Sequence, residues 1–137
     1  GRVERAFEKL TDPIRRYPKG KIIMNNDQLY LLKPDFQDQG KTYYCPGCAE
    51  VIGILEFYPE LKRSIDIHYV DFPRPRPELI SLLGEANQGC PVLVLATVPQ
   101  ILPAQLNVQR ANGRAFVANA REIGAYLAHV HGIGLPH

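Results

Sequence analysis

The chain has 137 residues, of which 45% are hydrophobic and 22% charged, a composition typical of one soluble globular domain with its own core. No apolar run approaches the roughly 20 residues of a membrane span, so we expect a soluble, cytoplasmic protein without a membrane partner. The basic excess lies in residues 1–23, which carry seven Lys and Arg against three Asp and Glu. Because nucleic-acid binding needs clustered basic residues on the folded domain, we expect no nucleic-acid partner.

Residues 1–27 are predicted to be an N-terminal extension, partly helical or disordered, and residues 28–137 to be the folded domain. A short helical pattern opens the extension, and Pro13 and Pro18 interrupt it. Met24 is the only methionine in the chain, and one interpretation places the natural start of the protein there.

From residue 28 onward, apolar periodicity predicts alternating strands and helices. The predicted strands are 29–32, 65–72, 91–96 and 114–117. The predicted helices begin after the cysteine pair, at 78 and after 119, and end at Pro59, Gly84 and near Gly132. Residues 35–42 are expected to be a loop and 97–113 an insertion. The order β-α-β-α-β-β-α predicts an α/β fold with a central four-stranded mixed sheet and helices on both faces.

Cys45 and Cys48 enclose Pro46 and Gly47 at the predicted junction of the first strand and first helix. A thiolate at a helix N-terminus is stabilised by the helix macrodipole and by unpaired backbone N–H groups. Pro46 suits the first helical position, and Cys48 lies one turn on, within reach of Cys45. This pattern indicates a redox pair, although half of a metal site and an inert scaffold also fit it.

The core resembles the thioredoxin-like superfamily, in particular glutaredoxins and the N-terminal domain of glutathione transferases. Four segments look like a small bacterial family of thioredoxin-like domains of unknown function: 31–36 (LLKPDF), 44–48 (YCPGC), 71–76 (DFPRPR) and 87–95 (NQGCPVLVL). The likeness covers about residues 28–137. It implies a thioredoxin-like fold and passes on no assigned reaction.

The resemblance also implies a cis peptide bond before Pro91, which would bring Cys90 close to Cys45. We take Tyr44, Pro46, Cys90, Pro91 and Asn119 as substrate-binding candidates. Tyr44 stands where thioredoxins have Trp, and Asn119 stands where glutaredoxins usually have Ser or Asp to hold the glutathione amino group. Glutathione is therefore a possible but weakened co-substrate.

Arg74 and Arg76, which lie between prolines, are expected in a solvated loop; the other interpretation is a rigid strip that contacts anions near the site.

The sequence thus favours a thiol–disulfide oxidoreductase of the glutaredoxin or thioredoxin type. Cys45 would attack a thiol or disulfide substrate, either a protein or glutathione, and Cys48 would resolve the mixed disulfide. No resident cofactor is expected, and a monomer and a homodimer are both compatible with the sequence. The alternative is a non-enzymatic thioredoxin-like binding module, or a metal or iron–sulfur carrier using Cys45, Cys48 and Cys90. Whether the protein is an enzyme stays open at this point.

Overall fold

The computed structural model describes residues 25–137, so the predictions for the extension before residue 25 lie outside the described residues. The strands are β1 (Asp27–Leu32), β2 (Phe36–Asp38), β3 (Lys41–Tyr43), β4 (Ile65–Val70), β5 (Val92–Val94), β6 (Gln109–Ala111) and β7 (Arg114–Ala118). The helices are α3 (Pro46–Phe57), α4 (Pro77–Leu83) and α5 (Ala120–His131), with a 3-10 helix η1 (Pro59–Arg63) after α3. Within residues 25–137 no helix has the length and apolar character needed to cross a membrane.

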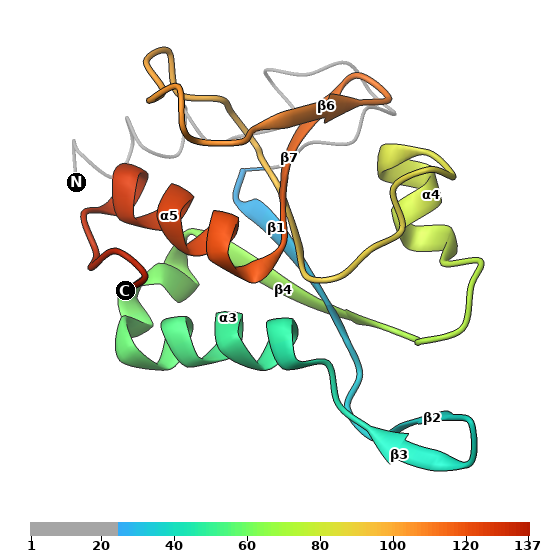
Figure 1. Ribbon diagram of the computed structural model, residues 1–137. Helices are drawn as coiled ribbons and strands as arrows, with labels where there is room; N and C mark the ends of the chain where they lie inside the picture. Colours follow the sequence, from blue (N-terminus) through green and yellow to red (C-terminus); the bar gives the residue numbers. More distant parts are fainter. Residues whose placement is uncertain (1–24) are drawn as a thin grey trace, which may run out of the picture.

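Five strands form the main sheet, in the order β4-β1-β5-β7-β6. The β1–β4 pair is parallel, and the other neighbouring pairs are antiparallel. The mixed α/β class predicted from the sequence is therefore confirmed (Figure 1).

The predicted count of four strands is wrong, because β6 adds a fifth strand inside the segment interpreted as an insertion. Asn112 and Gly113 both have positive φ, 52° and 74°. This conformation makes a tight two-residue turn whose twist suits a hairpin, and it lays Gln109–Ala111 against Arg114–Phe116. The Asn-Gly signal was present in the sequence, but the short strand before it has no apolar alternation to reveal it.

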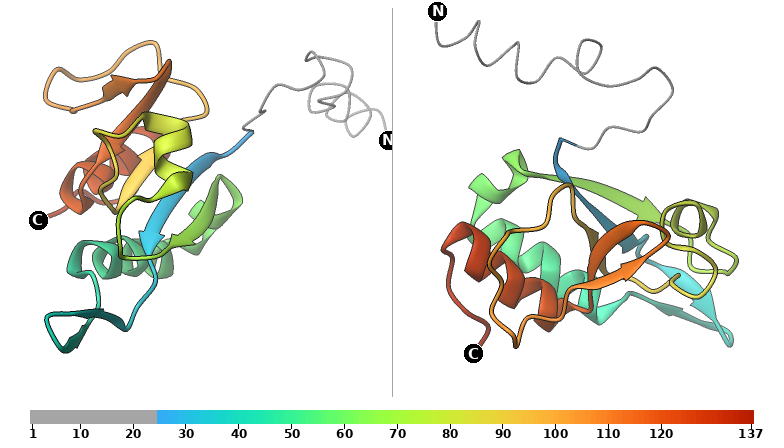
Figure 2. Two further views of the ribbon diagram at one scale, coloured as in Figure 1. Left: turned by 90° about the vertical axis from the view of Figure 1, so that its right-hand side faces the viewer. Right: turned by 90° about the horizontal axis from the view of Figure 1, so that it is seen from above.

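A second small sheet, formed by β2 and β3, occupies the region predicted as a loop. Gln39 and Gly40 turn the chain with positive φ. The Phe36 ring stacks on the Phe72 ring with centroids 4.2 Å apart, which fastens this hairpin to the segment after β4. The hairpin extends from the body of the protein next to the start of α3 (Figures 1 and 2).

Helices cover both faces of the main sheet, as the alternation of side chains requires. On β5, Leu93 belongs to the core shared with α3 and α5, whereas Val92 and Val94 pack in a second core with α4. The helices α3 and α5 contact each other on one face (Figure 2). The start of α3 and the segment that enters β5 meet at one end of the sheet, and the cysteines lie there.

Candidate functional site

Cys45 is the N-cap residue of α3, with extended backbone geometry (φ −82°, ψ 114°) and Pro46 in the first turn. The backbone N–H of Cys48 donates a hydrogen bond to Cys45 Sγ, with N···S 3.2 Å. Sulfur thus takes the capping role that an oxygen of Ser or Asp usually has. The Cys45 sulfur therefore accepts a backbone N–H at the positive end of the helix dipole. The pair lies at the N-terminus of a helix, as the sequence predicted.

Cys48 has the opposite environment, since only 5% of it is exposed. Burial, with a smaller contribution from the neighbouring Cys45 thiol, raises the pKa of Cys48 to about 12, although the backbone N–H of Leu32 donates to its sulfur at 3.4 Å. Cys48 is therefore a protonated thiol at neutral pH. Two thiols on one helical turn thus differ in exposure and in hydrogen bonding.

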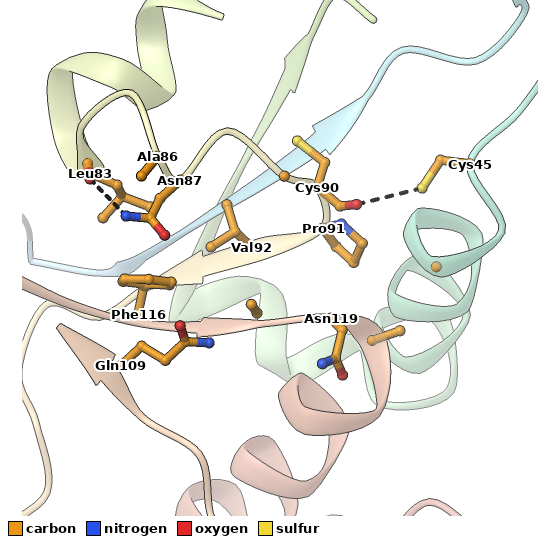
Figure 3. Close-up of a pocket in the computed structure, with 14 residues that line it drawn as sticks. Cys45, Leu83, Ala86, Asn87, Cys90, Pro91, Val92, Gln109, Phe116 and Asn119 are labelled. Carbon is orange, nitrogen blue, oxygen red and sulfur yellow. Dashed lines mark hydrogen bonds between the residues drawn. The ribbon is translucent and has the colours of Figure 1, made fainter. Parts of the chain in front are cut away.

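The segment of Cys90 and Pro91 lies against this pair, 45 positions away in the sequence. The Cys90–Pro91 peptide bond is cis, as the resemblance implied, and a second cis bond, Arg74–Pro75, was not predicted. The Cys45 thiol points to the carbonyl oxygen of Cys90, with S···O 3.9 Å. Figure 3 shows that this carbonyl faces Cys45 while the Cys90 side chain is directed away. Burial raises the pKa of the Cys90 thiol to about 11, with the Arg76 charge acting in the other direction.

Gly47 lets the first turn of α3 approach Pro91 closely. A Cβ at this position would lie 3.1 Å from Pro91 Cδ, closer than side chains normally pack. Glycine in a helix is otherwise unfavourable relative to alanine. No local sequence pattern assigns a role to Gly47, because its contact with Pro91 exists only when the two segments meet.

Arg76 is buried, with 5% exposure, which corrects the expectation of a solvated loop, while Arg74 is exposed as expected. The Arg76 Nε donates to the Phe72 carbonyl at 3.0 Å, and a terminal nitrogen donates to the Gln88 carbonyl at 2.7 Å. The Gln88 side chain in turn accepts from the Arg76 backbone N–H at 2.7 Å. These bonds connect the segment after β4 to the segment that enters β5. The guanidinium thereby supports the backbone that carries Cys90.

A groove of about 480 Å³ opens on the Cys90 side of Cys45 (Figure 3). Its lining residues come from both cores and from the starts of α3, β5 and α5. They are Cys45, Gly47, Leu83, Ala86, Asn87, Gly89, Cys90, Pro91, Val92, Gln109, Phe116, Ala118, Asn119 and Ala120. None of these side chains is charged. The polar groups that it offers are the amides of Asn87, Gln109 and Asn119.

Asn119 lines the groove and also caps α5, because its side-chain oxygen accepts from the Glu122 N–H at 3.0 Å. Its backbone has φ 64° and ψ 155°, a region that residues other than glycine rarely adopt. The predicted N-cap is present, and the cap occupies the oxygen of this substrate-binding candidate.

A smaller cavity of about 220 Å³, here called the hollow, lies on the other side of Cys45. It is lined by Leu31, Leu32, Pro34, Tyr44, Cys45, Cys48, Ala49, Ile52 and Tyr69. Cys45 lines both the groove and the hollow, whereas Cys48 lines only the hollow. Tyr44 is 63% exposed and belongs to the hollow, so the structure separates it from the other substrate-binding candidates. Pro46 is exposed and lines neither cavity.

The alternative of a three-cysteine metal site finds no support in the geometry. Across the part of the chain that the structure describes, no three His, Cys, Asp or Glu side chains are grouped so that they could hold a metal ion. The Cys90 side chain, which would have been the third ligand, points away from Cys45 (Figure 3).

Comparison with known proteins finds a match to a protein family. A family model described as a protein of unknown function (DUF3088) matches residues 26–135, which include the main sheet, its helices and both cavities. No curated protein and no solved structure matches the chain.

Proposed function

The chain belongs to the DUF3088 family of proteins of unknown function, and we propose from its own site that it is a thiol–disulfide oxidoreductase with a thioredoxin-like core. The observation that carries the proposal is the unlike thiol pair at the start of α3. Cys45 is partly exposed and hydrogen-bonded, whereas Cys48 is buried one turn away. A nucleophilic thiol and a shielded resolving thiol are the two parts that dithiol exchange needs.

The thioredoxin-like assignment is supported by the order of the elements and by the place of the pair. Removal of β2, β3 and β6 leaves β-α-β-α-β-β-α, with β1 parallel to β4 and the cysteines between β1 and α3. In this interpretation, β6 and the β2–β3 hairpin are additions to the core.

The proposed reaction begins when the Cys45 thiolate attacks one sulfur of a substrate disulfide. A bond forms between that sulfur and Cys45, and the other substrate sulfur leaves as a thiolate with the electron pair. Cys48 then attacks Cys45 Sγ, releases the second substrate thiolate and loses its proton, which the departing thiolates can accept. The substrate is reduced by two electrons, and the protein is oxidised to the Cys45–Cys48 disulfide.

The groove is the proposed position of the substrate. Cys45 and the Cys90 carbonyl lie at its edge, and three uncharged amides face it. Such a lining suits the backbone of a protein or peptide disulfide, whose polar groups are amides. Glutathione carries two carboxylates, and no lining residue offers them a positive charge. We therefore propose a polypeptide rather than glutathione as the preferred partner.

Equilibration of the purified protein across thiol/disulfide buffers tests the proposal. Remaining thiols are alkylated, and the modified cysteines are located by peptide mass spectrometry. We expect one two-electron transition between Cys45 and Cys48, within the range of about −120 to −270 mV that thioredoxin-like catalysts span. Thiols that stay reduced throughout the series would contradict the proposal and favour a non-enzymatic binding module.

A further inference from the structure

The hollow gives Cys48 an opening of its own. Cys48 does not line the groove, so a substrate in the groove reaches Cys45 and not Cys48. Among the cavities described for residues 25–137, the hollow is the one that offers a route to the buried Cys48. Its walls are aliphatic, and its two aromatic residues, Tyr44 and Tyr69, are partly exposed, at 63% and 49%.

The two sulfurs of a Cys45–Cys48 disulfide are unequal leaving groups. Thiol exchange is faster when the expelled thiolate is the more stable one. Attack on Cys48 expels Cys45, whose sulfur accepts the backbone N–H of Cys48. Attack on Cys45 expels Cys48, whose thiolate is disfavoured by burial, with a pKa of about 12. Leaving-group stability therefore favours attack on Cys48, provided that a nucleophile can reach it.

The lining of the hollow limits which nucleophile can enter. None of its nine residues is charged, so a charged thiol would lose hydration there without gaining an ionic partner. Its volume of about 220 Å³ is below the roughly 300–1,000 Å³ of sites for drug-sized ligands. These two properties restrict the occupant to a small, uncharged molecule.

We propose that the hollow is a second binding site, for a small uncharged dithiol that reduces the Cys45–Cys48 disulfide by attacking Cys48. This inference rests on the proposed function, because it supplies the reductant for the oxidised pair. The groove then serves the disulfide substrate and the hollow serves the reductant, on opposite sides of Cys45.

The reducing step transfers two electrons from the dithiol to the Cys45–Cys48 disulfide. A thiolate of the dithiol attacks Cys48 Sγ, a bond forms between the two sulfurs, and Cys45 leaves as a thiolate with the electron pair. The second thiol of the reductant then attacks the reductant sulfur that is bonded to Cys48, and a cyclic disulfide forms. Cys48 leaves and takes up the proton. The neutral dithiol loses two electrons and two protons in all: Cys48 takes up one proton, and the other, released to solvent when the attacking thiolate forms, balances the charge of the Cys45 thiolate.

Access to the hollow is tested first in a variant that carries Cys45→Ser and Cys90→Ser, in which Cys48 is the only cysteine. Two thiol reagents that differ in charge, methyl methanethiosulfonate and the anionic sulfonatoethyl methanethiosulfonate, are compared at Cys48 and at free cysteine. We expect the preference for the uncharged reagent to be about tenfold greater at Cys48, a difference of about 1.4 kcal/mol in barrier. Equal preferences at Cys48 and free cysteine would overturn the proposal.

Two matched substitutions in the same background locate the entry route. Ala49 lines only the hollow and Ala86 only the groove, and both are exposed. Ala49→Leu should slow the uncharged reagent about tenfold, and Ala86→Leu should leave the rate unchanged. Identical rates in the two variants would contradict entry through the hollow.

The reducing step is tested on the oxidised protein with all three cysteines. We compare 2-mercaptoethanol, which is uncharged, with the anionic 2-mercaptoethanesulfonate, and we expect the Ala49→Leu variant to lose the preference for the uncharged thiol. A preference that survives this substitution overturns the inference while the oxidoreductase proposal stands. If no Cys45–Cys48 disulfide forms at all, the proposed function fails, and the reagent experiment at Cys48 still decides access to the hollow.

Discussion

The groove and the hollow differ in how the chain builds them. The hollow is formed by the end of β1 and the first turns of α3, together with Tyr69 of β4. The groove needs α4, the entry to β5, the strands β6 and β7 and the start of α5, with Arg76 behind its wall. The hollow therefore depends mainly on segments that are near each other in the sequence, whereas the groove exists only when distant segments are held in place.

The largest expected effect separates Cys45, which lines both cavities, from Cys48, which lines only the hollow. Cys45→Ser should reduce thiol exchange to the uncatalysed background, because Cys45, and not Cys48, lines the groove in which we place the substrate. The matched variant, Cys48→Ser, should keep the first step and accumulate a mixed disulfide on Cys45, detectable by intact-mass spectrometry. Full activity in the Cys45 variant would show that the pair is not the catalytic site.

The second prediction concerns the reactivity of Cys48 alone. In the Cys45→Ser, Cys90→Ser variant at pH 8, iodoacetamide should modify Cys48 at least about a hundredfold more slowly than after unfolding in urea, because burial raises its pKa well above the ordinary value of 9.0. The native rate should still rise about tenfold per pH unit from pH 8 to 10, since the thiolate population is far from saturation. A plateau near pH 9 would show that Cys48 is not shielded as the structure indicates.

The third prediction tests the dependence of the groove on Arg76. Arg76→Met should lower the free energy of unfolding by about 1–3 kcal/mol for each buried carbonyl left without a partner, namely those of Phe72 and Gln88. Urea titration measures the loss. Arg74→Met, at an exposed position two residues earlier, should change stability by no more than about 0.5 kcal/mol. Equal effects in the two variants would contradict the structural role of Arg76.

The smallest expected effect tests the contact between α3 and Pro91. Gly53 lies within α3 with open space around it, so Gly53→Ala should stabilise the protein by about 0.5–1 kcal/mol. Gly47→Ala should gain less, because its methyl group would meet Pro91 Cδ at 3.1 Å. We also expect Gly47→Ala, and not Gly53→Ala, to change the alkylation rate of Cys45. Identical stabilities and rates would mean that the close approach has no consequence.

Part of the fold could be predicted because its signals are local. Pro46, Pro59 and the caps at Cys45 and Asn119 fix where α3 and α5 begin or end, whatever they pack against. The apolar run at β5 likewise predicted a strand, which the structure buries on both faces. The strands β2, β3 and β6 escaped prediction, because each has only three residues and is ordered by a turn and a neighbour rather than by its own pattern.

The sequence by itself determined the order of the main helices and strands and the position of Cys45 and Cys48 at a helix start, because periodicity, proline and capping act within a few residues. Only the tertiary structure decided that Arg76 is buried, that the Cys90 carbonyl rather than its thiol faces Cys45, and that Tyr44 lies across Cys45 from the groove. These features depend on which way a side chain points after distant segments meet. The direction of each side chain is determined by packing and by the hydrogen bonding of buried polar groups. Neither can be predicted from the spacing of residues along the chain.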